Sequence, residues 1–179
     1  QFVLVKLSAL AVRDVVAGEL EWGTGPRAED VRIKWPNDIL VERRKVCGIL
    51  IRTEVQGDKV ASAVVGMGLN VNSTELSAEL GATSLYMLTG HWTERLPLLD
   101  KVLQRFEHYW ELFLAGDRAW EEQYRNALYA RGRWADLELD GRPHRGRPMD
   151  VDDMGRLLVE EEGGGVKAYG HERLRFPMH

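Results

Sequence analysis

The chain has 179 residues and a formal net charge of −4 at pH 7, and hydrophobic residues make up 44% of it. This length suits one medium domain, or one domain with a small module, and the hydrophobic content excludes wholesale disorder. The acidic balance argues against a non-specific nucleic-acid binder, which needs a basic face. The single cysteine, Cys47, excludes an intrachain disulfide and a zinc site built from several cysteines.

No segment approaches the roughly 20 apolar residues of a membrane span, and none has the pattern of a signal peptide. We therefore expect a protein of the reducing cytoplasm that does not bind membranes. The chain begins at Gln1, already inside an apolar run, so we expect that its natural beginning lies further upstream.

Apolar spacing predicts the elements in chain order. Residues 4–20 carry apolar side chains at helical spacing. Three strands of an antiparallel meander follow, at residues 39–41, 46–55 and 60–71. Two more helices are predicted at residues 98–114 and 120–129. The first of these has a wide apolar stripe that consists of Leu99, Val102, Leu103, Phe106, Tyr109, Trp110 and Phe113.

The pattern of the chain changes near Arg131. Beyond it, short apolar runs alternate with turn signals such as Asp140-Gly141 and the glycine run 163–165. Closely spaced turn signals are typical of a small β-barrel. We therefore predict two domains: a mixed α+β domain at residues 1–131, with a largely antiparallel sheet and flanking helices, and a barrel at residues 132–179.

A polar run interrupts the predicted sheet. Lys34-Trp35-Pro36-Asn37-Asp38 lies between two apolar runs, and Lys45 follows shortly after it. Two ammonium groups, a carboxamide and a carboxylate together suit a small anionic ligand and a metal ion. The alternatives are structural: Lys45 would be a solvated lysine at the tip of a hairpin, and Asp38 would cap a turn.

A second feature is the run Gly66-Met67-Gly68-Leu69-Asn70. Glycines two positions apart in a strand leave one face without side chains, so a ligand can lie against the backbone there. Asn70, at the end of the strand, suits a phosphate or a metal-bound water. The alternative is a bulge or a bend. The run is not a dinucleotide fingerprint, because no third glycine and no helix start follow it.

Together these motifs resemble the biotin protein ligases. The resemblance rests on three blocks in this order, at residues 31–41, 44–51 and 65–72, with Ala82-Thr83-Ser84-Leu85 after them. It implies that family's fold, similar to class II synthetases, with an SH3-like barrel at the C-terminus. It also implies that biotin reacts with ATP, with Mg²⁺ present, to give biotinyl-5′-AMP. The biotin then passes to a lysine of a biotin carboxyl carrier protein.

The resemblance also implies roles for individual residues. Lys45 matches the catalytic lysine beside the biotin carboxylate and the α-phosphate, and Asp38 matches a catalytic carboxylate that helps to deprotonate or orient the acceptor lysine. The implied biotin-binding residues are Lys45, Gly48, Ile49, Leu50, Gly66 and Gly68. The implied ATP-binding residues are Lys34, Asn37 and Asn70.

Two parts of the family pattern have no counterpart in this sequence: a Ser/Thr-containing strand for the biotin ureido group and a Gly-Arg-Gly-Arg-x-Gly loop. We therefore expect residues 1–179 alone to form biotinyl-AMP slowly. The alternatives are a lipoate ligase relative, which the intact run around Trp35 disfavours, and a non-catalytic module that binds the carrier protein. Exposed strand edges also suggest a homodimer.

Overall fold

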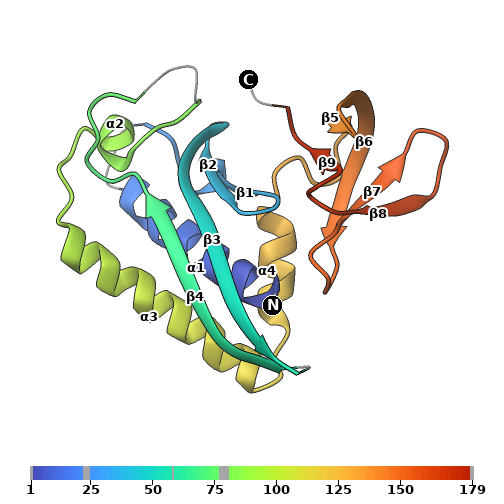
Figure 1. Ribbon diagram of the computed structural model, residues 1–179. Helices are drawn as coiled ribbons and strands as arrows, with labels where there is room; N and C mark the ends of the chain where they lie inside the picture. The colour runs from blue at the N-terminus through green and yellow to red at the C-terminus, as the bar shows by residue number, and fades with distance from the viewer. Residues whose placement is uncertain (1, 22–24, 58, 77–80, 178–179) are drawn as a thin grey trace.

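The computed structural model describes residues 2–21, 25–57, 59–76 and 81–177. It contains two antiparallel sheets that are connected through helices (Figure 1). The elements of the first part are α1 (Phe2–Leu20), η1 (Ala28–Asp30), β1 (Val31–Lys34), β2 (Asp38–Val41), β3 (Arg44–Gln56), β4 (Lys59–Leu69), α2 (Leu85–Thr89), α3 (Arg95–Leu114) and α4 (Ala119–Ala127). The elements of the second part are β5 (Ala135–Leu139), β6 (Arg142–Val151), β7 (Leu157–Glu161), β8 (Val166–Tyr169) and β9 (Leu174–Arg175).

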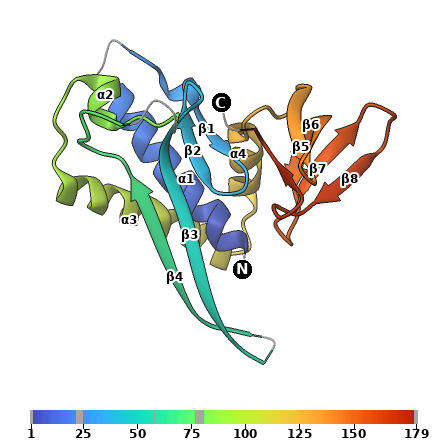
Figure 2. The ribbon, with the colours of Figure 1, turned by 45° about the horizontal axis from the view of Figure 1, so that its top comes forward.

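The first sheet has the strand order β1-β2-β3-β4, with every neighbouring pair antiparallel. The predicted meander is thus confirmed. The turn between β2 and β3 consists of Glu42 and Arg43, which both have positive φ angles (49° and 77°), as a two-residue type I′ hairpin requires. The long hairpin of β3 and β4 projects beyond the helices at its far end (Figure 2).

Helix α1 is the centre of the first part of the chain. It packs against β1, β2 and β3 on one side and against α3 and α4 on others (Figure 1). Its buried residues are distributed around the helix rather than along one stripe. A helix that is apolar on several sides lies inside a protein, and the predicted helix at residues 4–20 takes that position.

Helix α3 buries a narrower face than its apolar stripe predicts. Leu98, Val102 and Tyr109 are buried, whereas Leu99 and Leu103 are 50% and 53% exposed. Because α3 packs mainly on α1, only the side chains that point toward α1 join the core. The predicted helix is present, but only part of its apolar stripe is buried.

The second sheet has the order β8-β7-β6-β5-β9. It begins at Ala135, close to the change in composition near Arg131. The predicted closed barrel is not confirmed, because the described strands form an open sheet that ends at β8 and β9. Helix α4 lies between α1 and this sheet (Figure 1). None of the described helices combines the length and the apolar character needed to cross a membrane.

Candidate functional site

A row of four residues crosses the first sheet on the face opposite α1, which we call the open face. Lys34 pairs with Asp38 across the β1–β2 turn. Asp38 pairs with Gly48 on β3, and Gly48 pairs with Gly68 on β4. Residues directly opposite each other in antiparallel strands point to the same side of the sheet. The row therefore places a cation, a carboxylate and two bare backbone positions next to one another.

Lys45 reaches the open face because of a β-bulge. Ile39 pairs with Cys47, and the next residue, Leu40, pairs with Lys45. Val46 is therefore the extra residue of the bulge, and both Val46 and Cys47 are fully buried. The bulge shifts the alternation by one residue, so that Lys45 points to the same side as Asp38 and Gly48.

The ammonium group of Lys45 lies over the bare backbone of Gly48. Its Nζ atom is 2.6 Å from Oδ1 of Asp38. A Cβ atom on residue 48 would lie 2.9 Å from the same Nζ, so a side chain there would force the Lys45 ammonium to move. Glycine at this position therefore makes room for the Lys45–Asp38 ion pair, whose side chains are 44% and 21% exposed.

Leu50 and Gly66 extend the open face beyond the row. They pair with each other, and Leu50 is 61% exposed. Ile49 lies on the other side of β3, where it is 2% exposed in the core around α1. Neighbouring residues of a strand point to opposite faces, so Leu50 and Ile49 cannot both contact one ligand. The structure places the Ile49 side chain in the core and not on the open face, and its contact with biotin stays a prediction.

The two asparagines of the predicted site are tied to the backbone. Asn37 donates from Nδ2 to the Ile49 carbonyl at 2.6 Å, and its own carbonyl accepts from the Ile49 N–H at 2.9 Å. Asn70 donates from Nδ2 to the Thr83 carbonyl at 3.0 Å. Each amide group therefore stabilises a junction between elements. An amide oxygen is an acceptor, which suits a metal ion rather than a phosphate oxygen.

Charge and burial change the titration of two neighbouring groups. Burial lowers the pKa of Lys34, the Asp38 carboxylate acts in the opposite direction, and the Lys45 ammonium lowers it further. A nearby anion would favour the protonated form of Lys34. Burial raises the pKa of the Cys47 thiol to about 12, so this cysteine is a protonated core residue rather than a nucleophile.

One segment near the site had no structural prediction from the sequence. The Lys45 N–H donates to the Gly81 carbonyl at 2.8 Å, and the Thr83 N–H donates to the Lys45 carbonyl at 2.8 Å. Ala82 thus forms a parallel bridge with Lys45, and the segment fixes the backbone beside the bulge. The only available signal was the match of residues 82–85 to a family motif, which does not predict the contact.

Two hollows of the protein lie away from the open face. One of about 290 Å³ is lined by residues of α1, of the α2–α3 connection and of α3, including Trp92 and Lys101. The other, of about 450 Å³, is lined by Lys6, Trp120 and neighbouring residues. Neither of these two hollows is lined by Lys34, Asp38 or the glycines of the row.

Comparisons with known proteins identify relatives across most of the chain. A model of the "Biotin/lipoate A/B protein ligase family" matches residues 1–70. The bifunctional ligase/repressor BirA of Bacillus spizizenii is 32% identical over 176 residues, which cover 92% of this chain and 51% of the relative. The biotin–[acetyl-CoA-carboxylase] ligase of Paracoccus denitrificans is also 32% identical, over 88% of this chain and 66% of the relative.

A solved structure agrees with these matches. The biotin protein ligase of Aquifex aeolicus, solved in complex with biotin and ATP, superposes with a TM-score of 0.73 at 27% identity, over 99% of this chain and 72% of that one. The chain belongs to the biotin protein ligase family. The biotin protein ligase match extends over both sheets, because nearly the whole chain is covered. The chain spans about half the length of the Bacillus relative.

Proposed function

We propose that this chain carries the activation site of a biotin protein ligase, where biotin and ATP form biotinyl-5′-AMP and pyrophosphate. One observation carries the proposal: the Lys45 ammonium lies over Gly48, within a row that continues into Gly68. A cation beside a strip of bare backbone suits a ligand that has a flat, largely apolar body and a carboxylate at one end.

The chemistry of the first step requires positive charge. An oxygen of the biotin carboxylate attacks the α-phosphorus of ATP, and the bond from that phosphorus to the bridging oxygen of pyrophosphate breaks. Negative charge gathers on the phosphoryl oxygens as this happens, and fixed cations stabilise it. Lys45 would meet the carboxylate and the α-phosphate, and Lys34, at the other end of the row, would meet the phosphates. Mg²⁺ would enter with ATP.

The second step uses the same row. The lysine of the carrier protein must lose a proton before its amine attacks the acyl carbon of biotinyl-AMP and releases AMP. Asp38 would accept a hydrogen bond from that lysine, take up its proton and orient the amine, since its carboxylate is partly exposed beside Lys45. Leu50, also exposed on this face, would contact the apolar part of biotin. Asn37 and Asn70 would offer their amide oxygens to Mg²⁺.

The proposal extends to the organisation of the protein. Residues 1–131 would supply the catalytic part and residues 132–179 the SH3-like module, to which the five antiparallel strands lend support. The partner would be the biotin carboxyl carrier protein of an acetyl-CoA carboxylase, as the names of the relatives suggest. The protein would act in the cytoplasm, and the exposed edge of β4 suits pairing of two copies.

The direct test measures adenylate formation with labelled ATP and biotin. Lys45→Ala should reduce the rate about 100-fold, because the charge that stabilises the transition state is lost. Lys167→Ala, which removes an exposed lysine on β8, is the matched control and should keep the wild-type rate. Because we expect a slow reaction from residues 1–179 alone, calorimetric binding of a non-hydrolysable biotinyl-AMP analogue gives a second readout.

The outcomes separate the proposal from its alternatives. A wild-type chain that binds the carrier protein but neither biotin nor the analogue is a docking module, and the proposal fails. Lipoate that reacts in place of biotin would make the chain a lipoate ligase. An equal rate or affinity in Lys45→Ala and the wild type would remove Lys45 from the site.

A further inference from the structure

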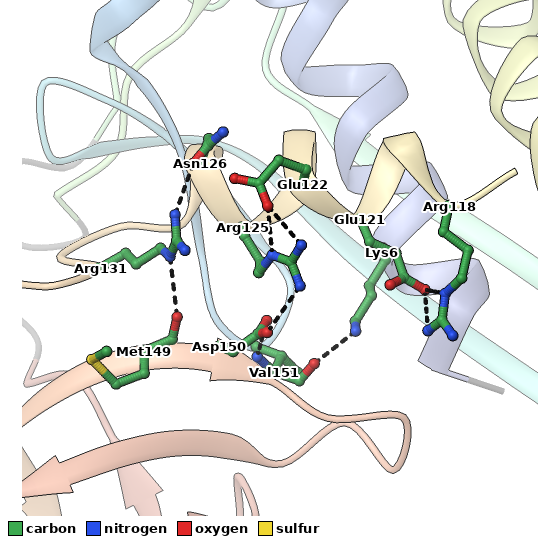
Figure 3. Close-up of polar contacts among 10 residues, drawn as sticks. All are labelled: Lys6, Arg118, Glu121, Glu122, Arg125, Asn126, Arg131, Met149, Asp150 and Val151. Carbon is green, nitrogen blue, oxygen red and sulfur yellow. Dashed lines mark hydrogen bonds and ion pairs between the residues drawn. The ribbon is translucent and has the colours of Figure 1, made fainter. Parts of the chain in front are cut away.

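The second sheet is held against the first domain by a set of polar contacts (Figure 3). Lys6, on α1, donates from Nζ to the Val151 carbonyl at 2.7 Å, and this lysine is buried. Arg131 donates from Nε to the Met149 carbonyl at 3.1 Å. Both acceptors belong to the end of β6, so this strand end and the turn that follows it are fixed in place.

One contact from this turn reaches the candidate site. The indole Nε1–H of Trp35 donates to the Gly155 carbonyl at 2.9 Å. Trp35 is 2% exposed and lies in the turn between Lys34 and Asp38. A residue of the β6–β7 turn, 120 positions further along the chain, therefore contacts the turn on which two predicted site residues depend.

The β6–β7 turn is rigid enough to act as a support. The Asp152 carboxylate accepts from the Met154 N–H at 3.0 Å and from the Arg156 N–H at 2.9 Å. Gly155 has a φ angle of +83°, and a Cβ atom there would lie 2.4 Å from the ring of Phe2 on α1. Only glycine satisfies both the backbone conformation and the close approach, so the turn fits α1 in one position.

The β1–β2 turn is thus held at two points. Asn37 is bonded to Ile49 of β3 through its side chain and its backbone carbonyl, and Trp35 is bonded to Gly155. Asp38 directly follows Asn37, and its carboxylate lies 2.6 Å from the Lys45 ammonium. A shift of Trp35 would reach Asp38 through Pro36 and Asn37, the two residues that separate them.

We propose that Trp35 is a positioning residue, through which the Gly155 carbonyl of the second sheet fixes the Asp38 carboxylate opposite Lys45. The second sheet is then a structural part of the activation site rather than an appended module. The importance of this contact for ligand binding rests on the proposed function, whereas the contact between turn and sheet is independent of it.

The test compares Trp35→Phe, which removes the N–H donor and keeps an aromatic ring, with Trp134→Phe. Trp134 lies directly before β5, is 40% exposed and has Arg147 over its ring, so it is a control for a Trp-to-Phe change away from the β1–β2 turn. The first readout is the change in the amide NMR signals of Asp38 and of its partner Gly48. Both signals should move in Trp35→Phe and stay in place in Trp134→Phe. Unchanged signals in Trp35→Phe would overturn the proposal, whatever the chain binds.

The second readout is the calorimetric affinity for the biotinyl-AMP analogue. Trp35→Phe should weaken it roughly ten-fold, while the melting temperature stays close to that of Trp134→Phe, since a merely structural role would lower stability without changing binding selectively. Gly155→Ala should weaken binding in the same direction. A wild-type chain that does not bind the analogue would contradict the proposed function, and the NMR comparison would then decide the positioning role. Equal affinity of Trp35→Phe and the wild type would contradict the positioning role itself.

Discussion

Gly48 has the strictest steric requirement among the residues of the candidate site. The ammonium group of Lys45 occupies the space that a side chain at residue 48 would fill. The nearest atoms are the flexible end of a lysine, which can move, so the fold tolerates a methyl group there. The consequence of a substitution should therefore appear in the position of Lys45 and not in the stability of the sheet.

We predict that Gly48→Ala displaces the Lys45 ammonium from Asp38 and weakens binding of the biotinyl-AMP analogue roughly ten-fold or more. Its free energy of unfolding should stay close to that of the wild type. Gly163→Ala is the control, because no atom lies within 4 Å of a Cβ at that glycine. Calorimetry and urea denaturation check both parts. Wild-type affinity in Gly48→Ala would contradict the prediction, because it would show that a methyl group at residue 48 does not disturb ligand binding by Lys45 and Asp38.

Strand β3 presents different chemistry on its two faces. Leu50 belongs to the open face and Ile49 to the core around α1, although the two residues are neighbours with similar side chains. The alternation of a strand predicts such a division, but the sequence does not say which face is open. Ile49 and Leu50 are both apolar and lie in one apolar run, so the sequence does not show which of the two is buried.

We predict that Ile49→Ala and Leu50→Ala have opposite consequences. Ile49→Ala removes a buried side chain and should lower the free energy of unfolding by about 2–5 kcal/mol. Leu50→Ala removes an exposed side chain and should change it by no more than about 0.5 kcal/mol, while weakening the affinity for the analogue. Urea denaturation and calorimetry on the two variants give the comparison. A large stability loss in Leu50→Ala would place it in the core instead.

The bulge in β3 sets the limit of what the sequence predicts about the site. Without a bulge, strict alternation counted from Gly48 would point Lys45 toward α1, on the same side as Cys47. The insertion of Val46 reverses this, and it depends on pairing with β2 and on the bonds to residues 81 and 83. The strands themselves follow from apolar runs and turn signals, but the register between them is a tertiary property.

The arrangement of the two sheets was accessible from the sequence only in part. The boundary near Arg131 follows from a change in pattern, and the second sheet does begin a few residues later. That this sheet is open is seen only in its strand order. The contacts of Trp35 and Lys6 with its β6–β7 end join residues more than 100 positions apart. No local pattern encodes such contacts. The partial exposure of α3 likewise depends on a tertiary contact, because α3 packs mainly on α1.

Lys6 gives the contact between α1 and the second sheet a dependence on pH. Burial lowers the pKa of its ammonium group below the ordinary value of 10.5, although the Asp150 and Glu121 carboxylates act in the opposite direction. The unfolded chain then holds this proton at higher pH than the folded chain does. As the pH rises through the lowered pKa toward 10.5, this group makes folding more favourable.

We predict that Lys6→Met loses this contribution. Between about pH 7 and about pH 10, the free energy of unfolding of Lys6→Met should rise less, or fall more, than that of the wild type. Lys167→Met, which changes an exposed lysine on β8, should retain the wild-type pH dependence. Urea denaturation across this range measures the difference between the variants, so that other titrating groups cancel. The same pH dependence in Lys6→Met and the wild type would argue against a buried ammonium at this contact.

The central claim is that Lys45, Gly48 and Gly68 form one ligand surface on the open face of the first sheet. A titration of the ¹⁵N-labelled chain with the non-hydrolysable biotinyl-AMP analogue, followed by NMR, tests it most directly. We predict saturable shifts of the amide signals of these three residues and of Leu50. Saturable binding that leaves the signals of Lys45, Gly48 and Gly68 unchanged would contradict the account.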